Sequence, residues 1–143
     1  MNEIDFTHFL QRATTEDPYF RFLRFQVHQL LPGNVVLKIY IDPDFQANWR
    51  AVAHGAPLAA LSDACMGWSC RTLGYHVVTV NMDMSFLRPI PEERWVYGEG
   101  KVVHRGKKTM VCEARLYDQE HHLALFGKGT YWIHHEIDLK TDI

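Results

Sequence analysis

One acidic residue of the sequence stands in otherwise apolar surroundings. Asp63 is the only charged side chain between His54 and Arg71. On a helix, its neighbours three and four positions away are alanine, methionine and glycine, which offer no cation and no hydrogen-bond donor. Asp63 therefore lies either on a narrow solvent-facing strip or beside a cavity, where a half-buried carboxylate can act as general base or nucleophile.

A second candidate group stands nine residues upstream of Asp63, since 63 − 54 = 9. His54-Gly55 marks the expected start of a helix, where the first backbone N–H groups have no intrahelical acceptor. The amide of Gly55 is therefore a candidate donor to an anionic oxygen that develops during a reaction. A His-Gly pair also occurs at ordinary loop ends, so by itself it is weak support.

Other clusters are interpreted mainly as structural. His121-His122 and His134-His135 invite a metal, but adjacent residues of a strand point to opposite faces, so no metal site is expected. Residues 127–130 lack the remaining glycines and the strand-to-helix context of a phosphate loop. The basic turn, defined as residues 105–108, is either a solvated turn or, together with Arg88, a site for phosphates.

Composition places the chain among ordinary globular proteins. With 143 residues, 47% of them hydrophobic and 22% charged, we expect a single domain over residues 1–143 whose core needs neither disulfides nor metal. The formal charge of −2 gives no field for a nucleic-acid partner.

Cysteine usage and the N-terminal segment bear on location. Three cysteines, with no zinc-ligand spacing between Cys65 and Cys70, indicate reduced thiols. No apolar run reaches the length of a membrane span, and the acidic N-terminal segment differs from a basic signal peptide. We therefore expect a cytoplasmic protein without a membrane partner.

Hydrophobic periodicity predicts the first elements. Residues 5–13 fit a short amphipathic helix, and residues 20–30, followed by a turn at residues 32–34 and an alternating strand over 35–41, predict a hairpin. Residues 55–73 form the longest helix candidate, with Pro57 in the first turn and Gly74 as the C-terminal cap. Because this helix is apolar on nearly every side, we expect it to be buried.

From residue 76 onward the hydrophobic period becomes two. Further strands are expected at about residues 95–104, 109–117 and 122–134, joined by short turns that favour antiparallel pairing. Together the elements predict an α+β domain whose sheet of about six strands curls around the buried helix. In the strand expected from residue 76 onward, one face carries Val78, Val80, Met82, Met84 and Phe86, and the other carries Val77, Thr79, Asn81, Asp83 and Ser85.

The spacing of these residues is also familiar as a set. Asn48 is followed, after five intervening residues, by His54-Gly55, and then by Leu58, Leu61 and Asp63. Thr79 lies in the next strand, and residues 85–89 (Ser-Phe-Leu-Arg-Pro) end it. The set, with residues 100–106 and 127–131, resembles the signature of the hotdog-fold acyl-CoA thioesterases, in particular the group with the phenylacetate-pathway enzyme and the mammalian thioesterase-superfamily proteins. The resemblance covers roughly residues 35–132.

The resemblance implies a role for each matched residue. Asp63 corresponds to the nucleophile or general base of the family. The amide of Gly55, with Asn48, corresponds to the group that polarises the thioester carbonyl. His54 corresponds to the motif histidine that orients Asn48 or its loop, and Thr79 to the hydroxyl that positions the attacking water.

The chain departs from the family pattern at one position. The matched motifs also define the substrate-binding residues less closely than the catalytic ones. Ala56 stands where the family usually has a second glycine, which leaves the pitch of the helix start open. Trp49 and Met66 either pack in the core or line an acyl pocket. The candidate substrate-binding residues are Ser85, Phe86, Leu87, Arg88, Arg105, Lys107, Lys108, Trp49 and Met66.

The family resemblance implies hydrolysis of an acyl-CoA thioester to a carboxylic acid and free CoA, with no metal or organic cofactor. It further implies a homodimer or a dimer of dimers, with each active site completed across the subunit interface. Two rivals remain: a hotdog hydratase of enoyl or hydroxyacyl thioesters, whose Asp-x-Asn-x-x-His pattern is absent, and a non-catalytic acyl-CoA-binding module, which would not need Asp63. Aryl-acetyl, short-chain and longer acyl groups all fit the sequence.

Overall fold

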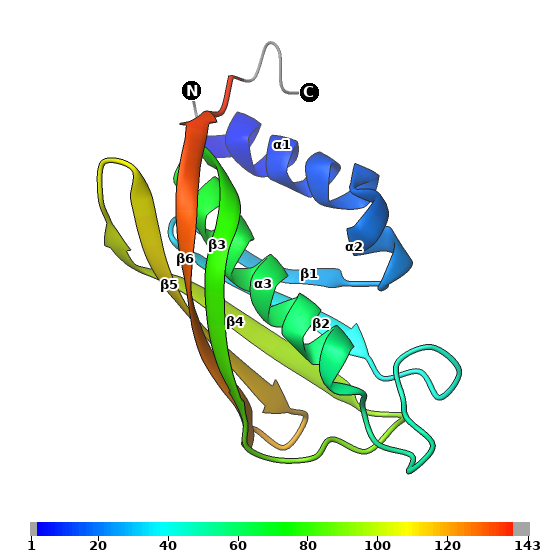
Figure 1. Ribbon diagram of the computed structural model, residues 1–143. Coiled ribbons are helices and arrows are strands. Elements are labelled where there is room, and N and C mark those ends of the chain that lie inside the picture. The colour runs from blue at the N-terminus through cyan, green and yellow to red at the C-terminus, as the bar shows by residue number, and fades with distance from the viewer. Residues whose placement is uncertain (1–2, 139–143) are drawn as a thin grey trace.

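The computed structural model describes residues 3–138 and contains one long helix packed on one antiparallel sheet (Figure 1). None of the helices in this range is both long and apolar enough to cross a membrane. The helices are α1 (Glu3–Glu16), α2 (Pro18–Phe22) and α3 (Gly55–Arg71), and the strands are β1 (Gln26–Leu31), β2 (Asn34–Tyr40), β3 (Tyr75–Phe86), β4 (Trp95–Arg105), β5 (Thr109–Asp118) and β6 (Leu123–Glu136).

The sheet has six strands in the order β1-β2-β4-β5-β6-β3, and each neighbouring pair is antiparallel. The sheet does not close on itself, so β1 and β3 are its edges. Figure 1 shows β3 and β6 side by side, with α3 lying along the face of the sheet. The predicted buried helix and its surrounding antiparallel sheet are confirmed.

The core forms between α3 and the inward rows of the strands. On β2 and just beyond it, the alternation predicts the buried row correctly, since Val35, Leu37, Ile39 and Ile41 are all fully buried. Glycine lets β4 approach the helix closely: a Cβ on Gly100 would lie 2.1 Å from the carbonyl oxygen of Cys65. This close approach fixes the height of α3 above the sheet.

The N-terminal region differs from the sequence prediction. Residues 20–22, predicted as the start of a strand, belong to the short helix α2. The reason is local capping, because the Asp17 side chain accepts a hydrogen bond from the Phe20 amide at 3.0 Å, and Pro18 occupies the first turn. Helix α1 also extends beyond the predicted residue 13, to Glu16.

The predicted alternation along the whole of β3 is wrong. The register against β6 shifts between Thr79 and Asn81, which is the effect of an extra residue in one strand of the pair. As a result Thr79 and Met84, expected on opposite faces, both turn toward α3 and the core. The side chains of Val78 and Val80 are exposed at this sheet edge, by 55% and 57%.

Candidate active site

The carboxylate of Asp63, on α3, accepts hydrogen bonds from side chains of β3 and β6. Thr79 Oγ1 donates to Asp63 Oδ1 at 2.8 Å, and the Tyr131 hydroxyl donates to the same oxygen at 2.8 Å. The hydroxyl of Tyr131 also lies 3.3 Å from the main-chain oxygen of Asp63. No group of residues 6–138 donates a hydrogen bond to Asp63 Oδ2, so this oxygen is available to a bound molecule.

The half-buried carboxylate lies at a cavity of about 180 Å³ between α3, α2 and β3. The two interpretations of Asp63, a solvent-facing strip and a cavity, therefore describe the same place, because the strip of α3 that carries Asp63 faces this cavity. The sheet-facing side of α3, with Leu61 and Cys65, is fully buried.

Tyr131 belongs to this candidate site through its contact with Asp63, and the sequence motifs do not predict it. Its side chain is buried, and burial, followed by the nearby negative charge of Asp63 and the hydrogen bond to it, raises the pKa of Tyr131 well above its usual value. The phenol therefore stays protonated and serves as a hydrogen-bond donor. The signal in the sequence is Gly129, where a Cβ would lie 2.9 Å from the Tyr131 ring.

The start of α3 is built from the other matched residues. His54 caps the helix, with Nδ1 accepting from the Ala56 amide at 3.4 Å, and its own amide donates to the Gln46 carbonyl at 2.7 Å. Asn48 Oδ1 accepts from the amides of Arg50 and Val52 at 2.9 and 3.4 Å, which shapes the preceding loop. Ala56 is helical and exposed, so it occupies the position of the second family glycine without strain.

Within one subunit, the predicted site residues lie in two separate groups. Asp63 and Thr79 meet, but Gly55 precedes Asp63 by eight helical residues, about 12 Å of helix axis at 1.5 Å per residue. Asn48 and His54 belong with Gly55. The Gly55 amide therefore cannot donate a hydrogen bond to the thioester group that Asp63 of its own chain contacts.

The segment that ends β3 lies with the Gly55 group. A second cavity, of about 340 Å³, is lined there by residues 86–90, Gly55 and Leu58, among others. The Phe86 ring is 3.6 Å from the position of a Cβ on Gly55. Ser85 is exposed on β3 just before this cavity.

The basic turn is far from Arg88 within one subunit. The Arg105 guanidinium stacks 5.1 Å from the ring centroid of Tyr75, the first residue of β3, and Lys107 and Lys108 are exposed beside it. Arg88 follows the other end of this 12-residue strand, so roughly 35 to 40 Å separates the two positions. One chain cannot direct both at a single phosphate group.

The two apolar candidates occupy different environments. Met66 is fully buried in a core cluster with Cys112 and Tyr131, which is the packing alternative. Trp49 is 91% exposed, with the Arg50 guanidinium 5.3 Å from its ring centroid. Neither side chain lines the cavity at Asp63.

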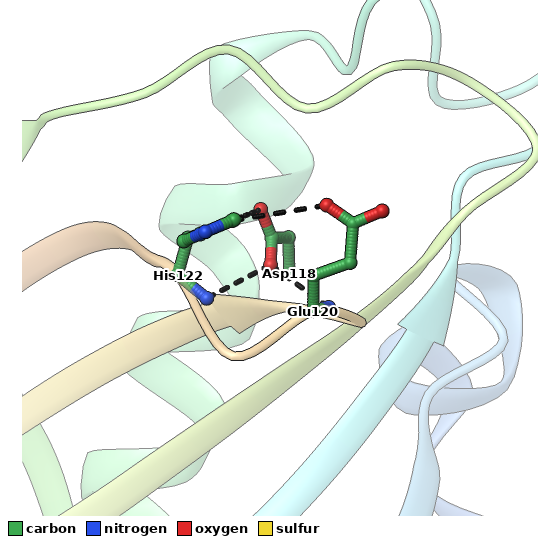
Figure 2. Close-up of side chains that lie close together, drawn as sticks. All are labelled: Asp118, Glu120 and His122. Atoms are coloured by element: carbon green, nitrogen blue, oxygen red, sulfur yellow. Dashed lines mark hydrogen bonds and ion pairs between the residues drawn. The ribbon is translucent and has the colours of Figure 1, made fainter.

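Within residues 3–138, one group has the composition and proximity of metal ligands: Asp118, Glu120 and His122 (Figure 2). Its atoms already have a structural use in the β5–β6 turn. Asp118 Oδ1 accepts from the amides of Glu120 and His122, and Oδ2 lies 3.1 Å from His122 Nδ1. Slight burial opposes ionisation of Asp118, but hydrogen bonds from His122 and Glu120 outweigh it and lower the pKa. The contacts among these three residues are therefore those of a hydrogen-bonded turn.

Comparison with known proteins identifies the fold. The E. coli PaaI protein from the phenylacetic acid degradation operon is 20% identical, with a TM-score of 0.83 over 88% of this chain and 91% of that chain. A hypothetical thioesterase of Streptococcus pneumoniae TIGR4, solved with coenzyme A, is 22% identical, with a TM-score of 0.76 over 80% and 91%. A Streptococcus mutans UA159 protein bound to acetyl CoA is 19% identical, with a TM-score of 0.76 over 80% and 91%. The predicted hotdog fold is therefore confirmed.

Sequence comparison gives the family. The model of the thioesterase superfamily matches residues 51–125, just over half of the chain. The matched range includes the start of α3, Asp63 and Thr79. This chain belongs to the thioesterase superfamily.

Proposed function

We propose that this protein hydrolyses acyl-CoA thioesters and that Asp63 carries the reaction. The observation that supports this most directly is a half-buried carboxylate at a cavity. One of its oxygens accepts hydrogen bonds from Thr79 and Tyr131, and the other has no donor in the described part of the chain. The superfamily membership and the coenzyme A ligands of the streptococcal proteins agree with such a substrate.

A spacing in the S. pneumoniae protein adds support. Two of its structures carry alanine in place of an aspartate and of a threonine sixteen residues later. Asp63 and Thr79 have the same spacing, since 79 − 63 = 16. In this chain that spacing allows a direct hydrogen bond between helix and edge strand.

Two chemical steps are compatible with the geometry. Asp63 either removes a proton from a water that attacks the thioester carbon, or attacks that carbon itself and forms an anhydride that water then cleaves. In both, the C–S bond breaks, the thiol of coenzyme A leaves and the acyl group ends as a carboxylic acid. Thr79 and Tyr131 orient the carboxylate, and the reaction needs neither metal nor organic cofactor.

A developing oxyanion also requires a donor, and a second subunit would supply it. The free edge of β3 exposes Val78, Val80 and Met82, an apolar strand edge that needs a cover. Antiparallel pairing of two β3 edges about a two-fold axis would bring the end of the partner's β3 near Thr79 and Asp63. The partner subunit's Gly55, which lies beside that end, would come near them as well. The same pairing would bring the partner subunit's Arg88 toward the basic turn. A homodimer, or a dimer of such dimers, is part of the proposal.

Release of free thiol from a panel of acyl-CoA esters tests the proposed function. A thioesterase releases one thiol for each ester cleaved. A binding module releases none, and a hydratase changes the absorbance of an enoyl thioester instead. Either of those two results would contradict the assignment.

Tyr131→Phe tests the role of the buried donor. The phenylalanine keeps the ring that packs under Gly129 but removes the hydroxyl that contacts Asp63. A hydrogen bond to a charged group contributes about 1.5 to 3 kcal/mol, so we expect kcat to fall about 10- to 100-fold with little change in KM. Tyr117→Phe, outside the Asp63 cavity, is the control. Equal kcat in both variants would remove Tyr131 from the mechanism.

Charge removal at Arg88 and Lys107 tests the expected contacts with the nucleotide of coenzyme A. Both side chains are exposed, and such ion pairs contribute about 0 to 1 kcal/mol each, so alanine at either position should raise KM by fivefold at most and leave kcat unchanged. The corresponding acyl-pantetheine, which lacks the nucleotide, should show no change. Lys101→Ala, at another exposed lysine, is the control. Similar KM shifts with both substrates would show that the phosphates are held elsewhere.

A further inference from the structure

The cavity at Asp63 continues along α3 to a second charged residue, Arg71. The floor is made of small helix residues at positions 60, 64 and 67, which leave room above the helix. Its apolar wall contains Phe20, Phe25 and Trp68. A cavity of about 150 Å³ holds a benzene molecule, so the 180 Å³ found here suits an acyl group of about six carbons.

Arg71 forms no ion pair with any side chain of residues 6–138, the part of the chain whose side chains the structure describes. Its guanidinium lies 4.6 Å from the ring centroid of Trp68, one helical turn earlier. Burial lowers the pKa of Arg71, and the charge of Asp17 partly opposes that effect. Asp17 also lines this cavity and caps α2, and it forms no ion pair with Arg71. Half-burial removes part of the hydration of the guanidinium, and its direct contact is the Trp68 ring and not a carboxylate of residues 6–138. An anionic ligand would compensate for the lost hydration.

The distance between Asp63 and Arg71 sets the size of such a ligand. The two residues are eight positions apart on α3, about 12 Å along the axis. Helix side chains lean toward the N-terminus, and the stacking on Trp68 confirms this direction for Arg71. The long Arg71 side chain therefore covers part of the span, which leaves room for roughly four or five carbons between a thioester carbonyl beside Asp63 and the guanidinium.

We propose that Arg71 is a specificity residue that selects acyl groups ending in a carboxylate, so that the substrates are CoA monothioesters of dicarboxylic acids with about five or six carbons. The proposal rests on the proposed thioesterase function. The distal carboxylate pairs with the guanidinium fork, and the methylene chain packs against Phe20 and Trp68. Hydrolysis breaks the C–S bond at the other end and releases the free dicarboxylate and coenzyme A.

Adipyl-CoA and hexanoyl-CoA provide the test, because they have six carbons each and differ in the terminal carboxylate. For the wild-type protein we expect kcat/KM for adipyl-CoA to exceed that for hexanoyl-CoA at least tenfold. Arg71→Met should lower the adipyl-CoA value at least tenfold, with the hexanoyl-CoA value unchanged or raised. Arg21→Met, at an exposed arginine of α2, should change neither.

A binding measurement checks the same point without turnover. Free adipate should bind the wild-type protein at least tenfold more tightly than hexanoate, and Arg71→Met should abolish the difference. Arg71 also lies in the last turn of α3, where its positive charge interacts favourably with the negative end of the helix dipole. That structural role predicts no discrimination between adipate and hexanoate.

Three outcomes would overturn the proposal. Equal hydrolysis of both esters by the wild type would remove the selectivity while leaving the thioesterase function intact. An equal loss with both CoA esters in Arg71→Met, absent with the pantetheine esters, would assign Arg71 to the phosphates of coenzyme A. Thiol release from no ester would contradict the proposed function, and with it this substrate class.

Discussion

Asp63→Asn is expected to lower kcat for a good acyl-CoA substrate by about 10² to 10⁴, the usual contribution of a general base. Asparagine retains the shape of the side chain and can still accept the hydrogen bonds from Thr79 and Tyr131, which both reach Oδ1. It cannot take a proton from water, and it cannot form an anhydride with the acyl group. Steady-state thiol release measures the loss.

Binding separates this effect from damage to the pocket. A non-hydrolysable acyl-CoA analogue should bind Asp63→Asn as well as the wild type, or slightly better because a carboxylate no longer repels the anionic ligand. Asp83→Asn, at an exposed aspartate of β3, is the matched control and should change activity little, since exposed substitutions usually stay within about 0.5 kcal/mol. Wild-type kcat in Asp63→Asn would eliminate the proposed mechanism.

Gly55→Pro is the second substitution with a large expected effect, because it removes one backbone N–H while retaining the helix. Gly55 is the first residue of α3, where proline is favoured, and His54 has φ −64° and ψ 146°, the extended conformation preferred before proline. Loss of one donor to the oxyanion costs about 10² to 10³ in kcat. We therefore expect a loss of this size with a melting temperature close to that of the wild type.

Gly55→Ala is the control for the volume added at this position. Its Cβ would lie 3.6 Å from the Phe86 ring, an ordinary contact, and the amide N–H remains. Gly55→Ala should therefore retain much more activity than Gly55→Pro. Equal losses in the two variants would indicate a steric effect on the substrate, and would argue against the amide as oxyanion donor.

The parts of the fold that the sequence predicts well are those with a strong local pattern. The buried row from Val35 to Ile41 and the helix from Gly55 onward follow from residues that are neighbours in the chain. The hydrogen bond between the Asp63 carboxylate and the Thr79 hydroxyl joins two residues that only the family resemblance assigns to one site. Nothing in the helix itself indicates which strand supplies the donor.

The features that the sequence does not predict depend on contacts between distant segments. Tyr131 is 68 residues from Asp63, and β6 places it beneath α3 only once the sheet has formed. The register shift after Thr79 has no local marker, and it reverses the face of every later side chain of β3. Helix length likewise separates Gly55 from Asp63, which the matched motif presents as one set.

We propose that one active site combines Asp63 of one subunit with the amide of Gly55 from the other. A heterodimer of Asp63→Asn and Gly55→Pro subunits, purified through two different affinity tags, tests it directly by thiol release. Each variant alone should be nearly inactive, whereas the heterodimer contains one site with both groups intact and should have about half the wild-type activity. A heterodimer of confirmed dimeric mass that remains as inactive as the two parent variants would contradict the shared site.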